Sequence, residues 1–246
     1  MNPNEEFQEE RRKAVLDMGK DKKFREMSLD WILKSNEHKY GYNFTWMGRP
    51  IIQFPNDMFI IQELIWEVKP DLIIETGIAH GGSIIFSASM LELIGRNGKV
   101  VGIDVDIRKH NRVELEKHPM MKRIVMLEGS STDEEIVNQV YEIAKDKKSI
   151  MVFLDSYHTH EHVLGEMNAY GELVSVGSYM VVFDTCIELF PKGYCSDRPW
   201  DVEDNPMTAI DEFIEKNDTF IRDELLNSKA IITAAPDGYL RKIKAD

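Results

Sequence analysis

The stretch Asp71-Leu-Ile-Ile-Glu-Thr-Gly-Ile-Ala-His-Gly-Gly-Ser83 decides the fold of this chain. An apolar run from Leu72 to Ile74 ends at an acid, Glu75, and a glycine turn from Gly77 to Gly82 follows. After the turn, apolar residues recur at helical spacing. The pattern predicts a buried strand, a tight turn and the start of a helix. Glycines in such a turn let a nucleotide-like ligand lie close to the backbone.

The acid before the turn separates two candidate ligands. A dinucleotide fingerprint needs three glycines spaced Gly-x-Gly-x-x-Gly, with a pyrophosphate on the helix N-terminus. Here the first and third of those positions, counted around Gly77, are Glu75 and His80, and a carboxylate would repel a pyrophosphate. S-adenosylmethionine carries a sulfonium and an ammonium group, which suit an acid. We therefore expect this methyl donor, with a turn that binds no ligand as the plain structural alternative.

Two further segments predict a nucleoside site. Lys99-Val-Val-Gly-Ile-Asp104 is typical of a second strand that ends in an acid. Asp104 follows Gly77 at close to the spacing at which Rossmann folds place a carboxylate for ribose hydroxyls, and it fits both candidate ligands. Ser130 and Ser131, after the third expected strand, are placed to border an adenine ring.

Composition limits the class of protein. The chain has 246 residues, of which 43% are hydrophobic and 30% charged, as expected of a soluble globular protein with one large domain and appendages. No apolar run approaches a membrane span, and the charged N-terminus lacks a signal core, so we expect a cytoplasmic protein. The cysteines, Cys186 and Cys195, have no metal-type spacing and are expected to be reduced. A net charge of −13 argues against binding to nucleic acid or anionic membranes.

Strand and helix patterns alternate through most of the chain. Expected strands lie near residues 71–75, 99–104, 123–127, 149–154 and 178–183, and expected helices near 83–94, 108–117, 132–145, 160–174 and 206–216. Two apolar runs, 229–234 and 238–243, flank a turn signal and predict a terminal hairpin. The expected class is α/β: a Rossmann-like methyltransferase fold, with a mostly parallel seven-stranded sheet, a C-terminal antiparallel hairpin and an N-terminal helical extension.

The N-terminal part differs in composition from the rest. Residues 4–35 are highly charged and predict one or two helices, whereas residues 40–55 are rich in aromatic side chains and predict a loop. We therefore divide the chain into an N-terminal helical arm with an aromatic lid loop, residues 1–55, and a Rossmann-like methyltransferase domain, residues 56–246. The long arm suits subunit contacts, so we expect a homo-oligomer.

Polar residues follow the fourth and fifth expected strands. Asp155 and Asp184 end these strands, and the carboxyl ends of parallel strands meet at one edge of the sheet. The two carboxylates could hold Mg²⁺, which would lower the pKa of a substrate hydroxyl. The alternative is that Asp155 caps the next helix and Asp184 binds backbone amides.

The segment after Asp155 is dense in histidine. His158, in the loop before a helix, is placed to act as a general base. We interpret His160 and His162 as solvated residues of the first helical turn. A two-histidine iron site built from Asp155, His158 and His160 is a further alternative, but the all-β pattern of an oxygenase barrel is absent.

With these residues in place, the chain resembles the cephalosporin hydroxylase and rhamnosyl O-methyltransferase family, over roughly residues 40 to 243. The matching segments are Thr45 to Ile51, Lys69 to Ser83, Gly102 to Arg108, Asp155-Ser156 with His158, Tyr170, Gly177 to Tyr179, and the set Thr233, Pro236, Gly238 and Tyr239. Relatives with a metal often carry an acidic pair after strand five. Here the pair is Phe183-Asp184, so one ligand of that set is missing.

The resemblance implies an S-adenosylmethionine-dependent O-methyltransferase acting on a hydroxyl of a sugar, sugar nucleotide or glycosylated natural product. It implies His158 as the base, with Asp155 beside it, and Mg²⁺ at Asp155 and Asp184. From the motifs and the resemblance together, the expected cofactor contacts are Glu75, Thr76, Gly77, His80, Gly82, Ser83, Asp104, Ser130, Ser131 and Asp155. A nicotinamide-dependent oxidoreductase and a non-catalytic nucleoside-binding protein are the alternative functions.

Overall fold

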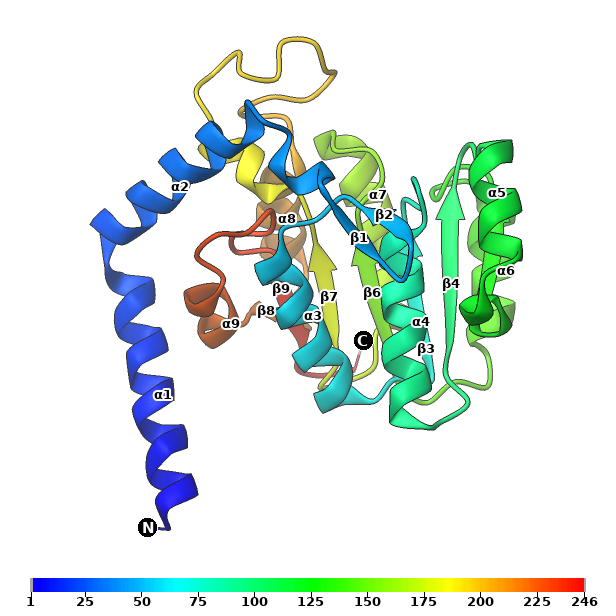
Figure 1. Ribbon diagram of the computed structural model, residues 1–246, viewed down its shortest axis with the longest axis horizontal. Coiled ribbons are helices and arrows are strands. Elements are labelled where there is room, and N and C mark those ends of the chain that lie inside the picture. Colours follow the sequence, from blue (N-terminus) through cyan, green and yellow to red (C-terminus); the bar gives the residue numbers. More distant parts are fainter. Residues whose placement is uncertain (1, 246) are drawn as a thin grey trace.

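A twisted seven-stranded sheet forms the centre of the protein, whose computed structural model describes residues 2–245 (Figure 1). The strand order is β5-β4-β3-β6-β7-β9-β8, parallel except where β9 pairs with β7 and β8. The strands are β3 (Leu72–Thr76), β4 (Lys99–Asp104), β5 (Ile124–Glu128), β6 (Ile150–Leu154), β7 (Tyr179–Val182), β8 (Phe220–Arg222) and β9 (Tyr239–Lys242). The mostly parallel sheet predicted from the sequence is confirmed.

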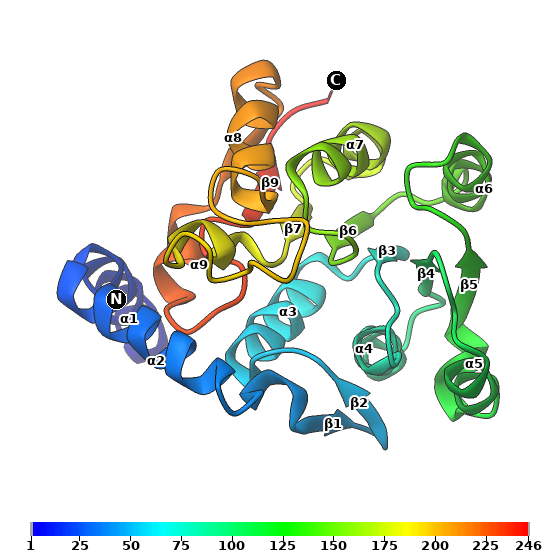
Figure 2. The same ribbon diagram turned by 90° about the horizontal axis from the view of Figure 1, so that it is seen from above.

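Helices cover both faces of the sheet, as Figure 2 shows from above. One face carries α3 (Pro55–Val68), α4 (Gly82–Ile94) and α5 (Lys109–Glu116). The other carries α6 (Glu134–Ala144), α7 (His160–Tyr170) and α8 (Pro206–Lys216). Short 3₁₀ segments lie at Tyr40–Tyr42, Pro119–Arg123, Gly171–Leu173 and Thr185–Leu189. No helix within residues 2–245 is long and apolar enough to cross a membrane.

Side chains of each central strand alternate between two hydrophobic cores, because successive residues of a strand point to opposite faces. In β3, Ile73 packs with the α3 and α4 face, whereas Leu72 and Ile74 pack with the α6, α7 and α8 face. All five residues of β3 are buried, and so are all five of β6. This double burial fixes the strand ends that carry the candidate site.

The antiparallel pair at the C-terminal end is present, but its first strand lies earlier than the apolar pattern indicated. β9 pairs with β8, and the run 229–234 is not a strand. Residues Glu224–Lys229 form helix α9 instead. Asp223 begins that helix, because its side chain accepts a hydrogen bond from the Leu226 amide.

The N-terminal residues form two helices and a small hairpin. α1 (Pro3–Lys20) has no buried residue and lies beside α9, and α2 (Lys22–Asn36) runs along the same side of the molecule toward β1 (Figure 1). Residues 40–55, expected as a loop, contain the antiparallel strands β1 (Phe44–Trp46) and β2 (Arg49–Ile51). The aromatic residues explain the difference: Trp46 packs on Phe86 of α4 with ring centroids 4.8 Å apart, so the segment has a surface on which to order.

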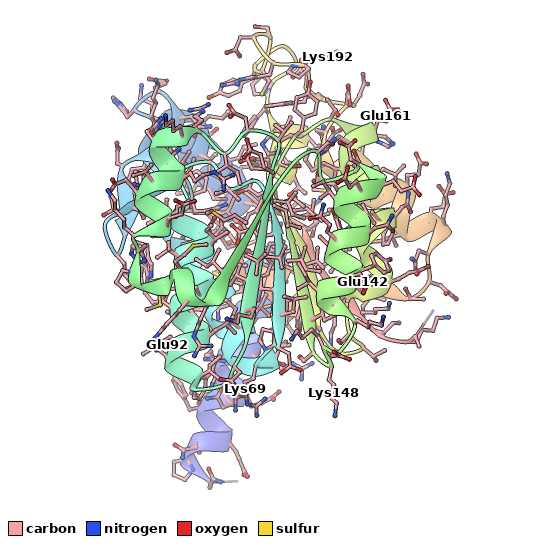
Figure 3. The ribbon with its side chains drawn as sticks, turned by 90° about the vertical axis from the view of Figure 1, so that its right-hand side faces the viewer. Lys69, Glu92, Glu142, Lys148, Glu161 and Lys192 are labelled. Atoms are coloured by element: carbon pink, nitrogen blue, oxygen red, sulfur yellow. The ribbon has the colours of Figure 1, made fainter. Side chains whose placement is uncertain are left out.

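The two ends of the sheet are readily followed in Figure 3. Lys69 and Lys148 lie at the lower end, just before β3 and β6 begin. Lys192 and Glu161 lie at the upper end, beyond the carboxyl ends of the strands. The acidic and glycine residues singled out in the sequence lie at this upper end.

Candidate cofactor and metal site

The glycine turn after β3 brings two strand ends into close contact. Gly77 has φ +89°, and a Cβ atom there would lie 1.9 Å from the carbonyl oxygen of Asp155. A side chain at this position would therefore push β3 and β6 apart. Gly82 has a different role: a Cβ atom there would lie 2.2 Å from the carbonyl oxygen of Pro50, so this glycine makes room for the N-terminal hairpin.

Glu75 is a buried acid at the end of β3 with one oxygen unsatisfied. The Ser83 hydroxyl donates to Oε1, whereas Oε2 is buried and has no hydrogen-bond partner within residues 2–245. Burial raises the pKa of Glu75 to about 7, and the nearby hydroxyls of Ser83 and Ser87 lower it only in part. A cationic group beside Oε2 would satisfy this oxygen and favour the charged carboxylate, so the site fits an ammonium-bearing ligand.

Asp104 holds the glycine turn in shape. Its Oδ2 accepts hydrogen bonds from the amides of Ile78 at 2.9 Å and Ala79 at 3.0 Å, and its Oδ1 accepts from the Asp106 amide at 3.0 Å. A carboxylate has about four acceptor positions, two on each oxygen, so Oδ1 keeps capacity for a ligand hydroxyl. Asp104, the last residue of β4, thus holds the turn and also lines the adjoining cavity.

A cavity of about 260 Å³ opens between these strand ends. Its lining residues are Gly77, Ile103, Asp104, Val105, Gly129, Ser130, Ser131, Ser156, Tyr157 and His162. The structure therefore brings together four of the expected cofactor contacts: Gly77, Asp104, Ser130 and Ser131. Val105 and Tyr157 are exposed at 73% and 46%, so each offers an apolar surface to a ligand.

The other six expected contacts lie outside the cavity lining: Glu75, Thr76, His80, Gly82, Ser83 and Asp155. Thr76 is fully buried, and its hydroxyl accepts from the Asp155 amide at 3.4 Å. His80 contributes its carbonyl oxygen, which accepts from Arg49 Nε at 3.0 Å and Nη2 at 2.8 Å. Together with Gly82, these residues build the turn and fix it to the N-terminal hairpin.

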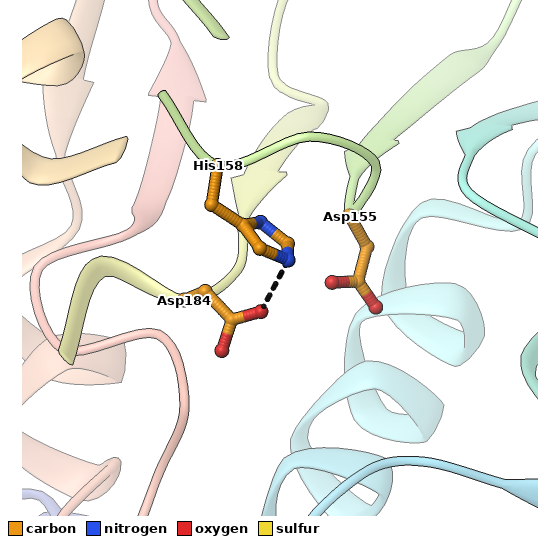
Figure 4. A group of neighbouring side chains, drawn as sticks. All are labelled: Asp155, His158 and Asp184. Atoms are coloured by element: carbon orange, nitrogen blue, oxygen red, sulfur yellow. Dashed lines mark ion pairs between the residues drawn. The ribbon is translucent and has the colours of Figure 1, made fainter. Parts of the chain in front are cut away.

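A carboxylate–histidine cluster lies next to the turn (Figure 4). The Nε2 atom of His158 is 3.0 Å from Oδ2 of Asp184, and Asp155, His158 and Asp184 each offer a ligand atom within 4.8 Å of the others. Gln53 donates to Oδ2 of Asp155 at 2.8 Å.

The charge of this cluster favours a cation. Burial raises the pKa of Asp155 well above its usual value, and the nearby carboxylates of Asp184 and Glu75 raise it further. A divalent cation between Asp155 and Asp184 would offset this repulsion, and oxygen ligands are those that Mg²⁺ prefers. The residues present therefore fit a magnesium ion.

Two histidines differ from the sequence interpretation. His160 does not join the cluster: its Nδ1 is 2.8 Å from Thr208 Oγ1 and its Nε2 is 3.0 Å from Glu212 Oε2. The iron-site alternative built on Asp155, His158 and His160 is therefore wrong. His162, expected in solvent, lines the cavity. Glu166, four residues further along the helix, could have indicated this, because residues at that spacing share a face.

An aromatic side chain from the loop after β7 packs on the cluster. The Trp200 ring lies 4.8 Å from the His158 ring and 5.4 Å from the Tyr157 ring, both nearly perpendicular. The Arg198 guanidinium lies 5.8 Å from the Trp200 ring centroid. The loop therefore presents an aromatic surface beside His158, with a cation against the tryptophan ring.

Comparisons with family models, curated sequences and solved structures all indicate the same protein family. Residues 38–243 match the family described as rhamnosyl O-methyltransferase/CmcI. A rhamnosyl O-methyltransferase of Mycobacterium bovis is 31% identical over 217 residues, covering 82% of each chain. An apo structure of CmcI superposes with TM-score 0.59 at 19% identity, over 83% of this chain and 78% of that one. A CmcI structure with Mg and SAM gives 0.56 at 19%, over 82% and 78%. These structural likenesses establish the shared fold.

Proposed function

The chain belongs to the rhamnosyl O-methyltransferase/CmcI family and is an O-methyltransferase, and we propose that it methylates a hydroxyl of a sugar, sugar nucleotide or glycosylated natural product. The proposed methyl donor is S-adenosylmethionine, which supplies an electrophilic methyl group. The cluster of Asp155, His158 and Asp184 beside the cavity is the observation that supports the proposal best. The curated relatives are methyltransferases, so the oxidoreductase and nucleoside-binding alternatives are not retained.

The proposed donor site uses the cavity and the turn together. Asp104 would accept a hydrogen bond from a ribose hydroxyl through Oδ1, and the purine would lie between Val105 and Tyr157, toward the serines. Glu75 would pair with the ammonium group through its unsatisfied Oε2. This arrangement would orient the donor toward His158, because Gly77 of the turn lies close to Asp155 of the cluster.

His158 is the proposed general base. A neutral imidazole can take the proton of an acceptor hydroxyl near neutral pH, and Asp184, 3.0 Å from Nε2, would stabilise the imidazolium that results. Asp155 and Asp184 would hold Mg²⁺, which supplies a positive charge that favours the alkoxide form of the acceptor. Trp200 shields the imidazole on one side and would border the acceptor sugar.

A methyl-transfer assay tests the proposal. Purified protein is incubated with labelled S-adenosylmethionine and rhamnosyl glycosides, other glycosides and sugar nucleotides, with Mg²⁺ or with EDTA. We expect transfer to at least one sugar hydroxyl and a loss of rate in EDTA. Transfer that is unaffected by EDTA would contradict the proposed role of Mg²⁺. A failure to bind S-adenosylhomocysteine in calorimetry would contradict the proposed donor site.

A further inference from the structure

A buried polar cluster lies behind the serine side of the cavity. Glu166 of α7 is fully buried, and its Oε1 accepts from the hydroxyls of Ser131 at 2.5 Å and Ser156 at 2.6 Å. Nε2 of His162 lies 3.1 Å from both hydroxyl oxygens and 3.3 Å from Oε1 of Glu166. Both serines and His162 line the cavity, so the cluster connects a buried acid to the ligand space.

The directions of these hydrogen bonds follow from the atoms present. A carboxylate only accepts, and each serine hydroxyl carries one hydrogen, so both hydrogens point to Glu166. Nε2 of His162 then faces only acceptors, so it carries a hydrogen and donates. The serine oxygens have no hydrogen left for the cavity. The Ser131 and Ser156 oxygens therefore offer lone pairs to the cavity and accept hydrogen bonds from a ligand there.

The surroundings of this cluster include one supporting hydrogen bond and one buried oxygen without a partner. The Tyr170 hydroxyl donates to the carbonyl oxygen of Ser131, which fixes the backbone of the loop after β5. Oε2 of Glu166 is buried without a hydrogen-bond partner within residues 2–245. A buried acceptor without a partner is unfavourable, so stability alone does not account for an acid at this position.

We propose that Glu166 is a positioning residue that turns Ser131 and Ser156 into hydrogen-bond acceptors, so that the cavity selects a 6-aminopurine over a 6-oxopurine. The exocyclic amino group of adenine donates hydrogen bonds to such acceptors, whereas the oxygen of hypoxanthine would meet their lone pairs. This inference rests on the proposed function, because it takes the adenosyl group of the donor as the occupant of the cavity.

Calorimetric titration with two ligands tests the inference. S-adenosylhomocysteine and S-inosylhomocysteine differ at purine position 6 and in the protonation of N1. We expect the unaltered protein to bind the adenosyl compound at least tenfold more tightly, because the inosyl compound leaves buried acceptors facing an oxygen. Equal affinities would overturn the inference. Failure to bind either compound would overturn the proposed donor site, and the inference with it.

The isosteric change Glu166→Gln tests the role of the acid. The amide group can donate to the serine oxygens, which frees a serine hydrogen to point into the cavity. We expect the affinity ratio to fall at least fivefold, through weaker adenosyl and stronger inosyl binding. A parallel loss of both affinities would show a structural role and overturn the inference. Glu161→Gln, an exposed acid on the same helix, is the matched control and should leave the ratio unchanged.

Ser156→Ala provides an independent measurement if Glu166→Gln does not fold. Ser156 is only partly buried, and the change removes one acceptor without altering the acid. We expect adenosyl affinity to fall several-fold, with little change in inosyl affinity. An unchanged adenosyl affinity would overturn the inference.

Discussion

The cavity and the loop that covers His158 are built in opposite ways. The cavity is formed by the ends of buried parallel strands, and backbone amides hold Asp104 in place. The loop from Pro191 to Asp204 is mostly exposed and contacts the site through Trp200. Changes at the cavity should therefore alter stability and donor affinity together, changes in the loop should alter acceptor use alone, and changes in the cluster between them should alter turnover.

The largest expected effect is on turnover, at the cluster. His158→Ala should lower kcat by about 10²–10⁴-fold, because it removes the base, and should leave the affinity for S-adenosylhomocysteine nearly unchanged. Steady-state kinetics and calorimetry measure the two quantities. His110→Ala, at an exposed histidine of α5, is the control. A parallel fall in donor affinity would assign His158 to the structure of the cavity instead.

The next effect is on stability, at the contact of β3 with β6. Gly77→Ala should lower the free energy of unfolding by about 3 kcal/mol or more, because it adds a clash with Asp155 to an unfavourable φ. Gly95→Ala separates the two causes. Gly95 has φ +76° but nothing within 4 Å of an added Cβ, so the change should cost only about 1 kcal/mol. If both variants lost the same free energy of unfolding in urea, the close contact of Gly77 with Asp155 would contribute nothing to the effect.

Glu75 should make stability depend on pH in an unusual direction. Its pKa is about 7 in the folded protein and near 4.5 in the unfolded chain, so the folded state binds this proton more tightly. As pH rises through that interval, the unfolded chain releases the proton first and the free energy of unfolding falls, by about 3 kcal/mol from this group. Urea unfolding across the interval should show a shallower fall for Glu75→Gln than for the unaltered protein. Identical slopes would contradict the assignment.

The smallest effect is expected in the loop. Trp200→Ala should raise KM for the acceptor by about tenfold, because it removes an aromatic surface beside His158, and should leave donor affinity unchanged. Trp66→Ala, at an exposed tryptophan of α3, is the control. Kinetics with varied acceptor measure the effect. A loss of donor affinity in Trp200→Ala would contradict the expectation that the loop affects acceptor use alone.

The sequence predicted the parts that depend on local chemistry. The run Leu72 to Ile74, the turn at Gly77 and the acid Asp104 could be placed, because strand burial and glycine geometry are local constraints. The meeting of Asp155 and Asp184 could also be expected, since parallel strands end at the same edge. The structure gives these residues their contacts, and their roles toward a cofactor or metal stay predictions.

The parts that were missed depend on contacts between distant segments. Residues 40–55 order as a hairpin because Trp46 packs on α4, which no local pattern reveals. The strand β8 was missed because three residues give too short an alternation. His162 was placed in solvent because its serine partners come from two separate loops.

The N-terminal hairpin has a consequence for how this protein can be dissected. The Arg49 side chain donates two hydrogen bonds to the carbonyl oxygen of His80 in the glycine turn. The Gln53 side chain, just after the hairpin, donates one to Asp155. A chain shortened to start at residue 56 would keep every strand of the large sheet and lose both contacts. The N-terminal hairpin therefore cannot be removed without changing the site. A chimaera that takes this segment from a relative would also replace the hydrogen-bond donors to the glycine turn and to Asp155.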